Sequence, residues 1–171
     1  VAPGWPERAA ELAYRDAAVS HVKNGAYGEM WVATMLAAAL VTDDLPTVLE
    51  VGLSEILARS RLAEAVRETM AAREAHRTWQ EAWDDLLGLL YGEMELGRTV
   101  SIAVMGGFDT DCNGATAGSI VRAMLGARKL PPRWVEPLND RLASIVAGYH
   151  DNRISDLAQR ALAAAKRVRS E

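Results

Sequence analysis

Apolar residues recur every three or four positions along almost the whole chain, and this spacing is typical of amphipathic helices. No segment shows the strict alternation of apolar and polar residues that marks a half-buried strand, so we expect no β-structure. The pattern predicts helices over 6–20, 27–41, 47–57, 60–72, 79–91 and 97–105, another from the end of the polar stretch 109–113 to about 127, and two more over 137–147 and 154–168. The sequence therefore predicts an all-α fold, a compact multi-helix domain.

Two of the predicted helices are expected to pack in different ways. The helix over 27–41 is apolar on nearly every side, so we expect it to be buried all round. The helix over 154–168 is amphipathic, and one face of it carries Ile154, Leu157, Ala161, Leu162, Ala165 and Val168. An apolar stripe of this kind normally covers a core on one side only.

The composition fits one globular domain. The chain has 171 residues, half of them apolar and only 6% aromatic. Its net charge of −4 argues against a nucleic-acid partner, because phosphate backbones are bound by clustered Lys and Arg. No apolar run reaches the roughly 20 residues that span a bilayer, so we expect no membrane partner. Cys112 is the only cysteine; this excludes an intramolecular disulfide and fits a reducing, cytoplasmic location.

Candidate chemistry is concentrated between Gly106 and Gly118. Asp109 and Asp111 stand two positions apart on what we expect to be an extended turn before a helix, so their carboxylates can point to the same side. Carboxylate oxygens suit Mg²⁺, which typically takes one or two of them and completes its shell with water. We further expect that the small residues Gly114, Ala115 and Gly118 let a bulky ligand approach the start of this helix.

A bare pair of aspartates also has a simpler interpretation, in which Asp111 caps a helix and Asp109 is a solvated loop acid. A second acidic motif, Thr42-Asp43-Asp44, lies just before Pro46. Its position before a proline in a first helical turn is typical of a helix cap. We therefore interpret the triplet as structural and leave it out of the predicted site.

The wider sequence around Asp109 resembles a known family. The string Gly-Phe-Asp-Thr-Asp-Cys-Asn-Gly-Ala, followed by a small-residue helix, is similar to the C-terminal metal motif of ADP-ribosylglycohydrolases. Four further segments resemble the bacterial branch of that family, namely 21–29, 90–93, 138–141 and 154–158. The resemblance covers nearly all 171 residues.

This resemblance implies an all-α hydrolase that removes ADP-ribose by cleaving its glycosidic bond, with two Mg²⁺ ions in a cleft and Mn²⁺ as a possible substitute. Asp109 and Asp111 match the second pair of metal-binding aspartates of the family. His21 matches a position that faces the bound ADP-ribose, and Tyr27 is a weaker candidate for a substrate contact. Cys112 stands where the family usually has Thr, and a thiol is a poor ligand for Mg²⁺. The resemblance assigns no catalytic residue within this chain.

The N-terminal half of the family carries a Gly-rich segment, a first metal triplet and an acidic residue proposed for acid–base work. These have no counterpart before Asp109 here, so we expect residues 1–171 to be the C-terminal part of a single domain, with a missing N-terminal half as partner and no activity alone. The alternative is a non-catalytic fragment or decayed relative that binds ADP-ribose or a divalent ion. A helical interaction domain is a third reading, and it predicts no response to divalent ions.

Overall fold

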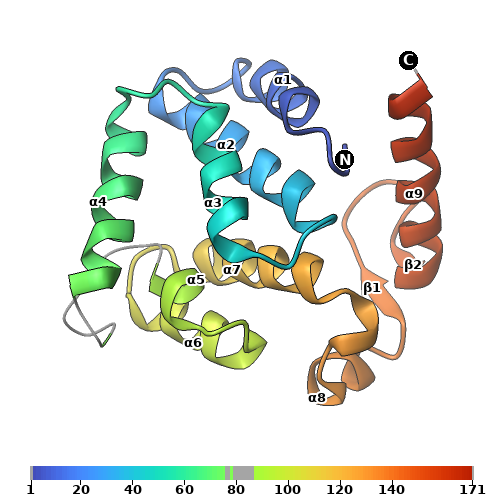
Figure 1. Ribbon diagram of the computed structural model, residues 1–171. Helices are drawn as coiled ribbons and strands as arrows, with labels where there is room; N and C mark the ends of the chain where they lie inside the picture. The colour runs from blue at the N-terminus through green and yellow to red at the C-terminus, as the bar shows by residue number, and fades with distance from the viewer. Residues whose placement is uncertain (1, 76–77, 79–86, 171) are drawn as a thin grey trace.

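The computed structural model describes residues 2–75, 78 and 87–170, and the predicted all-α class is confirmed (Figure 1). The α-helices are α1 (Pro6–Ala17), α2 (Asn24–Ala39), α3 (Leu45–Ser54), α4 (Arg61–Ala75), α5 (Leu87–Tyr91), α6 (Leu96–Met105), α7 (Thr110–Leu125), α8 (Pro132–Val135) and α9 (Ile154–Ser170). Short 3-10 turns η1 (Ala127–Lys129) and η2 (Glu136–Leu138) flank α8, and strands β1 (Arg141–Ala143) and β2 (Asp151–Arg153) precede α9. Within the described ranges no helix is long and apolar enough to cross a membrane.

The centre of the fold is α2, whose middle is buried as its sequence predicts, whereas Leu40 and Val41 at the end of the predicted helix are exposed. It contacts α1, α3, α4 and α7, and Figure 1 shows it running between these helices. Met35 is fully buried in the middle of α2, and Trp31 is 9% exposed. Thr34 is also fully buried, and its hydroxyl donates hydrogen bonds to the carbonyls of Met30 and Trp31 at 2.9 and 2.8 Å. The buried Thr34 hydroxyl is thus satisfied within the helix itself, whereas the buried Nε1 of Trp31 has no hydrogen-bond partner among the described residues.

Glycines set the close approach between α5, α6 and α7. A Cβ at Gly88 would lie 2.6 Å from the Thr99 carbonyl oxygen of α6. On α7, a Cβ at Gly114 or Gly118 would lie 3.0 Å from Val104 or 3.1 Å from Val100 of α6. The expectation that these two glycines leave room for a ligand is therefore wrong, because they face a neighbouring helix. They bring α7 close to α6 and so fix where α7 begins.

Three acidic residues stand at helix starts, and they behave differently. Asp44 accepts the Thr47 N–H of α3 at 3.0 Å, and its own N–H donates to the Thr42 hydroxyl at 3.2 Å. The interpretation of Thr42-Asp43-Asp44 as a cap is confirmed. Glu95 caps α6 by accepting the N–H groups of Gly97 and Arg98. Asp109 occupies the same position at α7, yet its carboxylate makes no capping hydrogen bond.

The predicted helix over 137–147 is wrong, and so is the expectation that the chain has no strands. Asn139 and Asp140 adopt positive φ angles of 49° and 56°, which end η2. β1 then pairs antiparallel with β2, with Leu142 opposite Asn152. The Asp140 carboxylate accepts the Ser155 N–H at 2.8 Å and the Arg153 Nε–H at 3.1 Å. Polar contacts close this hairpin, and its exposed strands leave no alternating apolar pattern for sequence analysis to detect.

The other predicted helices are present with shifted ends, and the part of the 79–91 prediction before residue 87 lies outside the described residues. The expected core face of α9 is mostly uncovered. Ala165 is its one buried residue, Leu162 is 56% exposed, and Val168 packs beside Ala2, Ala9 and Ala37. α9 thus lies at the side of the helical body, in contact with it through its C-terminal turns (Figure 1).

Gly88→Ala should lower the free energy of unfolding by about 1–3 kcal/mol, because its methyl group would overlap backbone of α6. Gly28→Ala is the matched control, since a Cβ on this helical glycine would meet nothing within 4 Å. It should raise the free energy of unfolding by up to about 1 kcal/mol, the helix preference of Ala over Gly. Urea denaturation followed by circular dichroism measures both. Shifts of the same sign would contradict the close α5–α6 contact.

Asp44→Ala should lower the melting temperature by about 2–4 °C, the usual loss when a helix cap is removed from a domain of this size. Asp109→Ala, melted in EDTA, should change it far less, because Asp109 makes no capping bond. Hydrogen bonds from the Thr47 hydroxyl and N–H lower the pKa of Asp44 in the folded protein. The stability due to Asp44 is therefore complete above the ordinary carboxyl range and lost as the pH falls through this lowered pKa.

The difference between wild type and Asp44→Ala should accordingly vanish in strong acid. Thermal melts from neutral to acidic pH provide the measurement. Equal losses for Asp44→Ala and Asp109→Ala at neutral pH would show that Asp109 has a capping role after all.

Candidate metal centre

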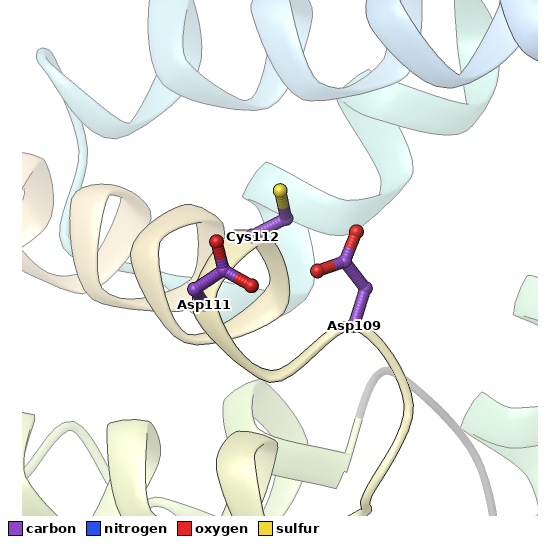
Figure 2. Close-up of side chains that lie close together, drawn as sticks. All are labelled: Asp109, Asp111 and Cys112. Carbon is purple, nitrogen blue, oxygen red and sulfur yellow. The ribbon is translucent and has the colours of Figure 1, made fainter.

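Asp109, Asp111 and Cys112 form a cluster at the start of α7. Asp109 lies on the segment that enters the helix, and the other two lie in its first turn (Figure 2). The expected extended turn is wrong, because the helix begins already at Thr110. The side chains converge all the same: one carboxylate oxygen from each aspartate and the Cys112 Sγ lie within 4.8 Å of one another. Gly107, with a φ of 79°, supplies the turn that leads the chain from α6 into this cluster.

The Cys112 thiol is held in its neutral form. A hydrogen bond to Asp109 is the largest cause of its raised pKa, and the negative charges of Asp109 and Asp111 add to it. A thiolate is the form that attacks as a nucleophile, so this environment disfavours a nucleophilic Cys112. The thiol instead lies within reach of both carboxylates as a neutral member of the cluster.

The donor set of the cluster suits a hard cation only through its carboxylates. All three side chains are exposed, so a hydrated ion can reach them. The N–H groups at a helix start favour nearby negative charge and oppose a cation, so a metal here depends on the aspartates. Mg²⁺ is commonly held by one or two carboxylates with water, which matches Asp109 and Asp111. In the described part of the chain, no second group of three His, Cys, Asp or Glu side chains comes together in this way.

A mainly apolar cavity of about 330 Å³ lies beside the cluster, bounded by α2, α4, α5 and α7. Asn113, two residues after Asp111, and Thr116 give it a polar edge on α7. On α2 it is bounded by Gly28 and Trp31, and the missing side chain of Gly28 leaves open space. The sequence analysis missed Asn113 and Thr116 as lining residues. The position of Asn113 two residues after Asp111 could have indicated that it lies close to the site.

His21 and Tyr27 lie near the start of α2 and are not among the residues that line this cavity. The His21 side chain is exposed, with its Nδ1 at 2.7 Å from the Ser20 hydroxyl and 3.5 Å from a carboxylate oxygen of Glu29. Tyr27 is half-buried in the first turn of α2 and lines a second cavity. The structure therefore brings Asp109 and Asp111 together, and places the two predicted substrate contacts outside this cluster and outside the lining of the apolar cavity.

Comparison with known proteins gives a family that covers the whole chain. The family model described as ADP-ribosylglycohydrolase matches residues 1–171. No curated protein and no solved structure matches the chain. The matched family consists of metal-dependent hydrolases that act on glycosidic bonds of the ADP-ribose type. Together with the all-α fold and the paired aspartates at the start of α7, this match shows that the chain belongs to the ADP-ribosylglycohydrolase family.

Proposed function

We propose that this chain takes part in hydrolysing the glycosidic bond of ADP-ribose, with Asp109 and Asp111 as ligands of Mg²⁺. The observation that carries the proposal is the use of the Asp109 carboxylate. Asp44 and Glu95 use their carboxylates to cap helices, whereas Asp109 leaves the N–H groups of α7 uncapped and turns toward Asp111 and Cys112. A carboxylate that gives up the usual bond at a helix start is available for a ligand.

The chemistry requires a positioned water and a proton donor. Cleavage at the anomeric carbon builds positive charge on the ribose while the leaving group is protonated. Bound Mg²⁺ supplies electrophilic polarisation and orients the reacting groups. Asp109 and Asp111 would hold the ion, and the neutral Cys112 thiol lies beside both carboxylates. Asn113 and Thr116 offer polar contacts at the edge of the adjoining cavity.

Two Mg²⁺ ions need more ligands than this cluster offers. Only two carboxylates converge here, and the remaining described residues provide no second cluster of this kind. We therefore propose that the other ligands and the proton donor come from an N-terminal half that pairs with residues 1–171 across the site. His21 and Tyr27 are proposed as substrate contacts, and the exposed His21 ring is oriented by Ser20 and Glu29.

Mg²⁺ or Mn²⁺ binding should depend on both aspartates. Asp109→Asn and Asp111→Asn should each abolish the calorimetric signal of a Mn²⁺ titration, because each removes one of the two charged ligands. Asp43→Asn is the matched control, since it removes one exposed acid from a loop outside the cluster. The two cluster variants should keep the circular dichroism spectrum of the wild type. Identical isotherms for all four proteins would remove the metal proposal.

Hydrolysis should require both halves. Residues 1–171 alone should release no ADP-ribose from a modified protein in Mg²⁺, and adding the N-terminal half should start release. In this reconstituted enzyme Asp109→Asn should abolish turnover.

In the same enzyme His21→Ala should raise KM more than it lowers kcat, because it removes a binding contact. Metal-dependent release by residues 1–171 alone would contradict the shared-ligand proposal, and a loss confined to kcat would contradict the role of His21.

A further inference from the structure

A basic cavity of about 870 Å³ lies at the start of α2, against the connection between α3 and α4. Three cations line it: Lys23 from the α2 side, and Arg59 and Arg61 from the connection. Asn24, Tyr27, Leu57, Ala58 and Ser60 complete the lining, which contains no acidic residue. Like charges gathered around one cavity repel each other, and an anionic ligand would remove this repulsion. The grouping stands out because the chain as a whole has a net charge of −4.

The two arginines are held by a rigid connection. The Ser60 N–H donates to the Leu57 carbonyl at 2.9 Å, and the buried Ser60 hydroxyl accepts the Ala63 N–H at 3.1 Å. Arg67 on α4 reaches back and donates to the Ala58 carbonyl at 2.7 Å. Arg59 and Arg61 thus flank a serine that is fixed in place. The backbone beneath both guanidinium groups is ordered before any ligand binds, which reduces the entropy lost on binding.

The third cation, Lys23, lies on the opposite wall of the cavity, at a residue with a positive φ angle. Lys23 is the N-cap of α2 and has a φ of 52°, a conformation that side chains with a Cβ rarely adopt. No side chain caps the N-terminus of α2, so the positive end of a 16-residue helix faces the same region. Such strain persists where the surrounding structure enforces it, often at ligand sites.

Among the described residues, the three cations differ from several other basic side chains in having no protein partner. Elsewhere Arg133 pairs with Glu95 at 2.9 Å and Arg153 with Asp140 at 3.1 Å. In the ranges that the structure describes, Lys23, Arg59 and Arg61 form no ion pair and no side-chain hydrogen bond. Their charges are available to a ligand from solution.

We propose that this basic cavity binds the phosphate groups of a small phosphorylated ligand. A diphosphate offers several charged oxygens to three cations on two walls, and Arg in particular binds phosphate through paired N–H groups. The uncapped start of α2 favours the same anion. Binding requires neither a metal nor hydrolysis, so the site stands whether or not the proposed function is correct.

The cavity also adjoins the apolar cavity beside Asp109. Asn24 and Tyr27 line the basic cavity, and Gly28 and Trp31 line the apolar one. These four residues follow one stripe along α2, because positions three, four and seven residues apart share a helix face. On α4, the neighbours Arg61 and Leu62 line the basic and the apolar cavity, respectively. A phosphorylated ligand in the basic cavity can therefore extend toward the aspartates.

Titration with pyrophosphate in EDTA tests the site. The wild-type chain should bind, and Arg59→Ser/Arg61→Ser should bind at least roughly tenfold more weakly, since each charge-assisted hydrogen bond is worth about that factor. Arg128→Ser/Lys129→Ser is the matched control, because it removes the same charge from an exposed site on η1 outside the cavity and should bind like the wild type. Lys23→Gln, which leaves the connection unchanged, should also weaken binding. All variants should melt like the wild type.

No binding by the wild type, or equal weakening by both double variants, would overturn the proposal. Asp109→Asn should bind pyrophosphate normally, so failure of the metal site leaves this result unaffected. A competition with ADP-ribose identifies the source of the phosphate. Displacement of pyrophosphate would show that the cavity holds the diphosphate of the substrate. Simultaneous binding would show that a separate phosphorylated ligand uses it; both results support a phosphate site.

Discussion

The burial of α2 is the constraint on which the rest of the described structure depends. A helix that is apolar on nearly every side must be surrounded by other helices, and α1, α3, α4 and α7 provide that cover. The cover also determines where the chemistry lies. Because α7 packs against α2, its first turns lie across the apolar cavity from Gly28 and Trp31. Because α4 does so too, Arg61 at its start comes close to the start of α2.

Close helix packing then fixes the aspartates. Gly114 and Gly118 let α7 approach the valines of α6, so α7 has little freedom to slide or begin elsewhere. With that start fixed, Asp109 lies at the capping position of α7. Its carboxylate makes no capping hydrogen bond and lies in the cluster with Asp111 and Cys112. The two carboxylates in turn favour the neutral form of the Cys112 thiol, since a hydrogen bond to Asp109 and the charges of both aspartates raise its pKa. Small residues in this segment thus serve the helix interface, and the polar residues beside them face the candidate site.

The charges around α2 are separated along the helix. Carboxylates gather by the apolar cavity on the α7 side, and three cations gather where α2 begins. A family that acts on ADP-ribose must recognise a ligand with both a sugar and a diphosphate, and these two groups need opposite kinds of partner. The separation keeps the proposed metal ligands and the proposed phosphate-binding cations from neutralising each other.

The sequence by itself determined the helical class, the buried character of α2, the capping role of Thr42-Asp43-Asp44 and the aspartate pair. Each of these features depends on the spacing of residues that are close together along the chain. Tertiary structure decided what local spacing does not contain. The strands β1 and β2 are exposed and closed by ion pairs, so they carry no alternating pattern. The cluster of Lys23 with Arg59 and Arg61 joins residues from two separate segments. Only the packing of α4 against α2 brings those charges together. The periodicity of apolar residues along the chain does not predict which helices pack against each other.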